Sequence, residues 1–169
     1  MNLTSLFPIS LKKLVYSSLY GFHSCYLACS TEEKVRERSS SGGFIKSFLS
    51  YLLNEGIVDY CIVTRAGDSQ HPFQAETIIT ADLDDIKSSR TNSIYAPTNP
   101  LAKLQQLNPN KQYAFVGLPC HCATIKEKRE TKKINNIPFL IELFCKFTPT
   151  IQFTKETIQS LGLEMEEIT

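Results

Sequence analysis

The clearest pattern in the chain is a stripe of apolar residues over 42–55. Its members recur at the spacing of one helix face, namely Phe44, Ile45, Phe48, Leu49, Leu52 and Leu53. Ser40 or Ser41 can cap the start of such a helix, and Gly56 can end it in the left-handed conformation. The pattern therefore predicts an amphipathic helix over 42–55.

Similar apolar runs and stripes follow one another along the rest of the chain. Short runs rich in β-branched or apolar residues predict strands near 22–28, 57–64, 73–80, 112–117 and 138–144. Helical spacing and capping residues predict helices near 81–89, 99–107, 120–131 and 151–162. This alternation is typical of an α/β fold with a mostly parallel sheet and flanking helices. We expect residues 1–21 to form a weakly structured lead-in segment to one α/β region over 22–169.

Composition narrows the class of protein. The chain has 169 residues, of which 42% are hydrophobic and 21% charged, with a net charge of +1. Such a chain can build a core, and its charge gives no electrostatic reason to expect nucleic acid as a partner. No apolar stretch approaches the length of about 18 residues that suggests a membrane span, so we expect no membrane insertion. The first residues lack the charged region of a signal peptide, which predicts a cytoplasmic protein.

The chain holds six cysteines, which in a reducing compartment are core thiols, metal ligands or redox thiols. Cys120 lies where a predicted strand turns into a helix, Cys122 follows it closely, and Cys145 comes at the end of the next strand. These thiols could converge at one sheet edge and bind an iron–sulfur cluster, which normally takes four cysteines, with Cys25 or Cys29 as the fourth. The alternative is that they are structural cysteines.

A run of small residues, Ser39 to Gly43, opens the predicted helix over 42–55. Free N–H groups at a helix start can bind an anion, such as the phosphate of a flavin or nucleotide. The alternative is a plain serine cap followed by a tight turn. On the first interpretation, replacing Gly42 and Gly43 by valine removes flavin binding with modest structural loss, unless a glycine has positive φ. Arg90 and Tyr95 are candidates for a ligand-contacting loop or for ordinary loop contacts.

Three segments of the chain resemble, in order, one known family. The run CSTEEKVRERSSSGGFIKSFLSYLLNEGIVDYCIV contains the SSSGG turn and the following helix that members of this family share, although Tyr60 replaces their usual glycine. The run KQYAFVGLPCHCATI is similar to its FVGTPCQ segment, with Leu118 for Thr and His121 for Gln. The run LIELFCKFTPT is similar to its LFCHGVPS segment and keeps Cys145. Over roughly 22–165 the chain therefore resembles the coenzyme F420 hydrogenase/dehydrogenase beta-subunit family.

The resemblance implies an oxidoreductase or electron-transfer subunit that binds FAD, with a 4Fe–4S cluster as a further candidate cofactor and coenzyme F420 as a candidate substrate. It implies partners among other redox subunits or a ferredoxin-like donor. The implied cofactor-binding residues are Ser40, Ser41, Gly42, Gly43, Gly117 and Pro119, and the implied metal ligands are Cys120, Cys122 and Cys145. Family members often carry further cysteines ahead of this region and continue well beyond it. Two alternatives stay open: a catalytically silent truncated homologue, and a small thiol-based metal-binding protein.

Overall fold

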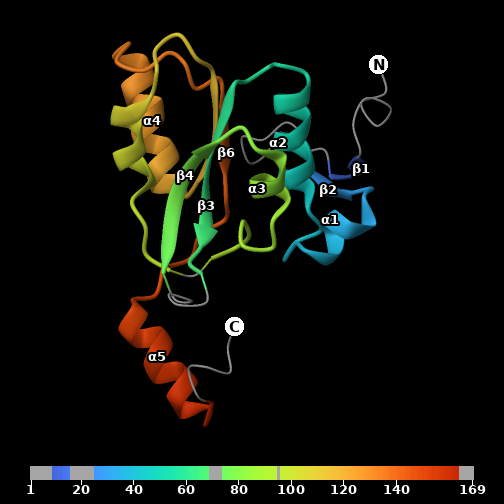
Figure 1. The fold of residues 1–169 in the computed structure, drawn as a ribbon, viewed down its shortest axis with the longest axis vertical. Helices are drawn as coiled ribbons and strands as arrows, with labels where there is room; N and C mark the ends of the chain where they lie inside the picture. The colour runs from blue at the N-terminus through green and yellow to red at the C-terminus, as the bar shows by residue number, and fades with distance from the viewer. Residues whose placement is uncertain (1–8, 16–24, 69–73, 95, 164–169) are drawn as a thin grey trace.

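The computed structural model describes residues 9–15, 25–68, 74–94 and 96–163. Its centre is a four-stranded sheet in the order β4-β3-β5-β6. The strands are, in that order, Ala75–Thr80, Tyr60–Ala66, Tyr113–Gly117 and Phe139–Glu142. β3, β5 and β6 are parallel, and β4 pairs antiparallel with β3. The mostly parallel α/β architecture predicted from the sequence is therefore confirmed (Figure 1).

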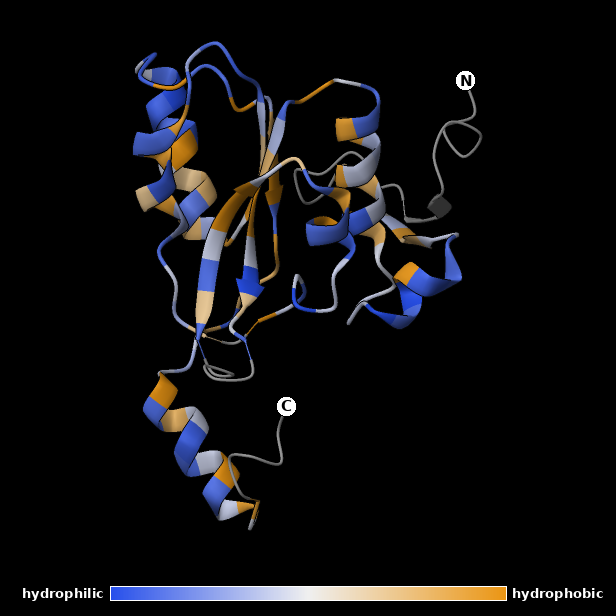
Figure 2. Ribbon diagram, viewed as in Figure 1, coloured by the Kyte–Doolittle hydropathy of each residue, from blue (hydrophilic) through white to orange (hydrophobic). Residues whose placement is uncertain are grey.

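Helices cover both faces of this sheet (Figure 1). α2 (Phe44–Asn54) and α3 (Leu83–Lys87) lie on one face, where the core contains Leu49, Leu52, Cys61, Val63, Ile86 and Ala114. α4 (Pro119–Glu130) and the 3₁₀ helix η2 (Pro100–Gln106) cover the other, where the core contains Ile62, Phe115, Cys122, Ile125 and Ile137. Successive strand residues point to opposite faces, so the sheet is apolar on both sides, as a covered parallel sheet must be (Figure 2).

A second, two-stranded sheet lies on the far side of α2. It pairs β1 (Ile9–Val15) antiparallel with β2 (Cys25–Ser30), and α1 (Glu33–Glu37) follows it (Figure 1). α2 contacts both of these strands as well as β3. The hydrophobic pattern did not predict β1 or α1, whereas β2 overlaps the strand expected over 22–28, of which residues 22–24 lie outside the described ranges.

Polar positions on α2 are buried as well as its apolar stripe. Lys46, Ser47 and Ser50 are all buried, although the pattern places them outside the apolar stripe. The Ser47 hydroxyl donates to that of Ser30 over 2.8 Å, which satisfies a polar contact between α2 and β2. The stripe predicts the face toward the large sheet, and tertiary contacts bury the other.

The structure contradicts the prediction at the start of α2 and confirms it at the end. The predicted serine cap is wrong, because Gly43 is the N-cap residue and no side chain caps the helix. At the other end, Gly56 has φ of 64°, its N–H donates to Leu53 O over 3.1 Å, and Ile57 N–H donates to Leu52 O over 2.9 Å. This Schellman arrangement confirms the glycine stop and delays the start of β3 to Tyr60.

The helix predicted over 99–107 is a 3₁₀ helix rather than an α-helix. Its apolar residues, Leu101, Leu104 and Leu107, recur every third position and all pack in the core beneath α4. Residues at i and i+3 align in a 3₁₀ helix, so this spacing suits its three-residue turn better than an α-helix.

The chain ends in α5 (Ile151–Ser160), which Figure 1 shows extending away from the sheet. Thr150 caps it as predicted, because its Oγ1 accepts from Phe153 N over 3.2 Å. Phe144, Phe147 and Phe153 are exposed on and before this helix. Within the described ranges, no helix is both long and apolar enough to cross a membrane.

The glycines flanking α2 offer a matched test of why its ends need glycine. Gly43 and Gly56 both have positive φ. A Cβ at Gly43 would lie 2.9 Å from Val35 Cγ1, whereas a Cβ at Gly56 would have no such neighbouring atom within 4 Å among the described residues. We expect Gly56→Ala to cost about 1 kcal/mol, the penalty for a left-handed alanine. Gly43→Ala should cost clearly more, because steric overlap adds to that penalty. Urea midpoints of the two variants measure the difference, and equal losses would mean that the start of α2 relaxes around the new methyl group.

Candidate cofactor site at the carboxyl edge of the sheet

The carboxyl ends of β3, β5 and β6 meet along one side of the sheet, called the carboxyl edge below. Gly117 at the end of β5 pairs with Glu142 at the end of β6, and Leu143 N–H still donates to Gly117 O over 2.9 Å. α2 leads through a short connection into the start of β3, so its own start lies beside the end of β3. Open α/β sheets usually bind ligands outside this edge.

Residues 39–43, the serine–glycine turn, lie ahead of α2 and have a fixed backbone. Gly42 and Gly43 have φ of 74° and 73°. Ser30 N–H donates to Gly42 O over 2.7 Å, and a Cβ at Gly42 would lie 3.0 Å from Cys29 Cβ. The fold itself therefore requires both glycines. The exception made above for a glycine with positive φ holds at both positions, so valine substitution should cause a large structural loss.

The uncapped start of α2 lies beside a buried cation. The first turn of a helix leaves N–H donors without intrahelical acceptors, and no side chain of the described residues caps this one. Lys46, in that turn, is only 5% exposed, and its Nζ donates to Arg38 O over 2.6 Å and to Ser88 O over 2.9 Å. Among the described residues its acceptors are both carbonyl oxygens rather than carboxylates. Burial first, and then the charge of Arg38, lower the pKa of Lys46.

Sequence reasoning did not identify Lys46. It lies outside the apolar stripe, where a lysine ordinarily faces solvent. Only the folded structure buries this position, where the Arg38 and Ser88 carbonyls, from two other segments of the chain, contact its Nζ. Ser40 and Ser41, which the sequence did single out, are exposed in the serine–glycine turn.

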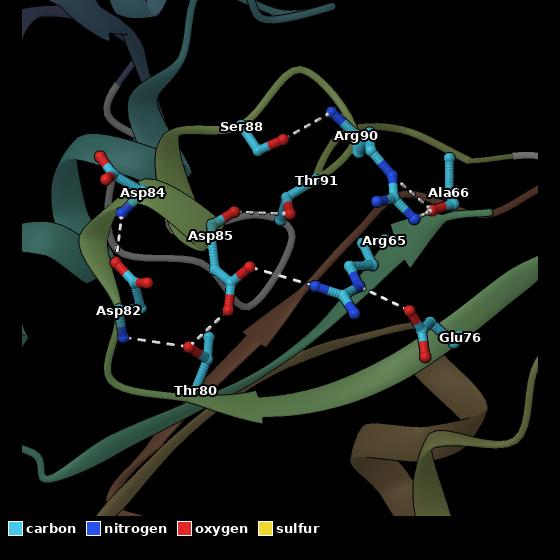
Figure 3. A network of polar contacts seen from close by, with 10 residues as sticks. All are labelled: Arg65, Ala66, Glu76, Thr80, Asp82, Asp84, Asp85, Ser88, Arg90 and Thr91. Atoms are coloured by element: carbon cyan, nitrogen blue, oxygen red, sulfur yellow. Dashed lines mark hydrogen bonds and ion pairs between the residues drawn. The ribbon is translucent and has the colours of Figure 1, made fainter. Parts of the chain in front are cut away.

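Residues 88–92, the bridging loop, connect this turn to the end of β3. The Arg90 guanidinium donates twice to Ala66 O, over 2.8 and 3.1 Å, and Ala66 N–H donates back to Arg90 O over 2.8 Å (Figure 3). Thr91 Oγ1 donates to Asp85 O over 2.7 Å, and the Asp85 carboxylate pairs with Arg65 (Figure 3). The Arg90 guanidinium thus attaches the bridging loop to the end of β3. Tyr95 lies outside the described residues.

The junction of β5 and α4 holds two further candidate residues. A Cβ at Gly117 would overlap the Phe115 ring, so packing alone requires glycine there. Pro119 is the first helical residue, where its missing N–H costs nothing. His121 Nδ1 accepts from Leu118 N–H over 3.3 Å, and burial lowers the pKa of His121. The family motif has Gln at this position, which serves the same capping role, so the replacement by His keeps a cap on α4.

The cysteines divide into exposed and buried thiols. Cys120 and Cys145 are exposed and follow the carboxyl ends of the adjacent strands β5 and β6. Cys122 is fully buried, with its Sγ 4.0 Å from Ile141 O, and burial raises the pKa of its thiol. Burial also raises the pKa of Cys61 to about 12. The half-buried Cys29 lies against Gly42, and the Cys25 side chain is outside the described part.

These positions do not by themselves fit a 4Fe–4S cluster. Within the described ranges, no three His, Cys, Asp or Glu side chains come together as a metal site. Cys120 and Cys145 are accessible, but Cys122 faces the core between α4 and the sheet. A cluster normally takes four cysteines, so one at this edge would need ligands from beyond the described residues.

The exposure of the thiols predicts the order in which they react. We expect iodoacetamide to modify Cys120 and Cys145 of the native protein at least about tenfold faster than Cys61 and Cys122, because only accessible thiolates react. Peptide mass spectrometry over a time course measures each site, and the same reaction in denaturant is the control that should remove the difference. Fast native labelling of Cys122 would contradict its place in the core.

Comparisons with known proteins agree with this architecture. An uncharacterized protein of Methanocaldococcus jannaschii is 29% identical over 144 residues, covering 82% of this chain and 49% of that protein. The beta subunit of coenzyme F420 hydrogenase from Methanothermobacter thermautotrophicus is 25% identical over 149 residues, covering 82% of this chain and 52% of the relative. This chain therefore spans about half the length of these relatives.

A solved structure shares the fold. One chain of the F420-reducing NiFe hydrogenase complex from Methanosarcina barkeri aligns with a TM-score of 0.68 at 21% identity, covering 78% of this chain and 47% of that chain. Two profiles of one family match the sequence itself. The N-terminal profile of coenzyme F420 hydrogenase/dehydrogenase, beta subunit, matches residues 25–106, and its C-terminal profile matches residues 110–169. The chain belongs to the coenzyme F420 hydrogenase/dehydrogenase beta-subunit family.

Proposed function

We propose that this chain is an FAD-binding electron-transfer subunit of an oxidoreductase, and that the serine–glycine turn and the start of α2 hold the flavin's phosphates. One observation carries the proposal. The uncapped start of α2 lies beside the buried Lys46 ammonium, whose acceptors among the described residues are carbonyl oxygens. Helix N–H donors and a cation without a carboxylate partner favour an anion at this point.

The diphosphate of FAD matches the chemistry of this position. The exposed Ser40 and Ser41 add hydroxyl donors next to the N–H groups of the first helical turn. Bound flavin would supply the hydride or electron transfer, while the protein's residues bind it and fix its orientation. Gly117 and Pro119, at the β5–α4 junction on the same edge, are the proposed contacts for the rest of the cofactor.

A 4Fe–4S cluster is a separate part of the proposal. Cys120 and Cys145 are the pair of thiols at the carboxyl edge that a ligand could reach. The described residues supply too few accessible thiols to hold such a cluster by themselves.

The names of the relatives suggest the acceptor and the partners. The Methanothermobacter relative is a subunit of coenzyme F420 hydrogenase, and the Methanosarcina structure is a complex. We therefore propose coenzyme F420, or a related acceptor, as the substrate, and other redox subunits or a ferredoxin-like donor as partners.

Purification without oxygen, followed by addition of FAD, tests the proposal directly. Flavin absorption bands that remain after gel filtration support FAD binding, and a broad iron–sulfur shoulder supports the cluster. Protein that stays colourless with excess FAD would contradict both and favour the catalytically silent homologue. Bound zinc, with neither flavin nor iron–sulfur cluster, would favour the thiol-based metal-binding protein.

A substitution in the serine–glycine turn separates phosphate binding from folding. We expect Ser41→Asp to weaken FAD binding by at least about tenfold, because its charge repels phosphate. The same charge near a helix start is neutral or favourable for stability, so the unfolding midpoint should not fall. Ser41→Asn is the control, since it has the same shape without the charge. Equal FAD dissociation constants for the two variants, measured by quenching of flavin fluorescence, would place the phosphates elsewhere.

The two exposed cysteines provide the test of the cluster. If the shoulder is present, Cys120→Ser and Cys145→Ser should each remove it and lower the iron content, whereas Cys61→Ala, a core substitution, should leave both unchanged. Iron content that is unaffected by the two serine substitutions would remove these residues from the ligand set.

A further inference from the structure

The serine–glycine turn is held in place by a residue from a distant part of the sequence. Asn92 Oδ1 accepts from Ser40 N–H over 2.9 Å, a contact that spans 52 residues of sequence. Its Nδ2 donates to Arg38 O over 3.2 Å. The same Arg38 carbonyl accepts from the buried Lys46 Nζ over 2.6 Å.

We infer that Asn92 is a positioning residue that holds the serine–glycine turn in its flavin-binding conformation. The inference rests on the proposed function, because it assigns Asn92 a role at the site proposed for the phosphates. The amide suits this role since it accepts from the backbone on one side of Ser39 and donates to the backbone on the other. The carboxylate of an aspartate could make only the first contact, and alanine could make neither.

Asn92 can position the turn because its own loop is rigidly attached. Arg90 and Ala66 exchange backbone and side-chain hydrogen bonds at the end of β3 (Figure 3). Thr91, the residue before Asn92, is buried and donates to Asp85 O over 2.7 Å. Lys46 closes the arrangement by donating to Ser88 O over 2.9 Å. The bridging loop thus fixes the serine–glycine turn relative to the end of β3.

The Arg38–Ser39 peptide bond provides a readout that does not depend on flavin. The Arg38 side chain is exposed, and trypsin cleaves after arginine, but the carbonyl of this bond is held by both Asn92 and Lys46. A protease needs a bond that can leave its native conformation, so local release of the turn should accelerate cleavage there. Lys132 and Lys133, exposed in the turn after α4, are the internal reference sites.

The experiment compares Asn92→Ala and Asn92→Asp with wild type and with Asn54→Ala, an exposed asparagine at the far end of α2. We expect Asn92→Ala to raise the FAD dissociation constant about tenfold, and to speed cleavage after Arg38 relative to cleavage after Lys132 and Lys133. Asn92→Asp should raise the dissociation constant in a salt-dependent way, because it adds a negative charge near the phosphates. Asn54→Ala should match wild type in both measurements.

Each result bears on a distinct claim. Wild-type protein that binds no FAD overturns the proposed function, and with it the flavin role of Asn92, whereas cleavage after Arg38 still reports whether Asn92 holds the turn. A wild-type dissociation constant in Asn92→Ala overturns the positioning role while flavin binding stands. Faster cleavage at every site in Asn92→Ala overturns it too, because Asn92 would then stabilise the whole fold rather than this turn.

Discussion

The burial of α2 on two sides is the constraint on which the rest of the carboxyl edge depends. Leu49 and Leu52 pack it against the large sheet, and its opposite side contacts the β1–β2 sheet. A helix held on both sides cannot rotate or slide, so the turn before it must reverse the chain in little space. Gly42 and Gly43 meet that requirement with left-handed backbones, which side chains other than glycine adopt only at a cost.

The contacts at the start of α2 also give the site a buried positive charge. Lys46 lies in the first turn of α2 and is buried where the segments holding Arg38 and Ser88 meet this helix. Backbone carbonyls satisfy its hydrogen bonds without neutralising its charge. Burying an ammonium without a carboxylate is costly, and an anion at the helix start would offset part of that cost. The folding constraint and the proposed phosphate site therefore involve the same residue.

At the carboxyl edge, some residues pack in the core while their neighbours are accessible to a ligand. On β5, Phe115 and Gly117 fill the core against each other, and the chain then turns so that Cys120 reaches the surface while Cys122 returns to the core. This offset of two residues, about half a turn of α4, decides which thiol can meet a ligand. It also explains why closely spaced cysteines in a sequence do not establish a metal site, since neighbours two apart on a helix point in different directions.

The sequence alone determined the elements whose packing has a simple period. The stripe over 42–55 predicted α2, the apolar runs predicted β3, β5 and β6, and Gly56 and Thr150 marked helix ends correctly. Motif order also identified the family. These features are local, because spacing and capping express themselves within a few residues of chain.

Only the tertiary structure decided the features that join distant segments. The buried state of Lys46 requires contacts with Arg38 and with Ser88, 42 residues away, and the contact of Asn92 with Ser40 spans 52 residues. The burial of Cys122 likewise follows from the packing of α4 against the sheet. Such contacts depend on which surfaces the fold brings together, and a one-dimensional pattern of apolar and polar residues does not contain that information.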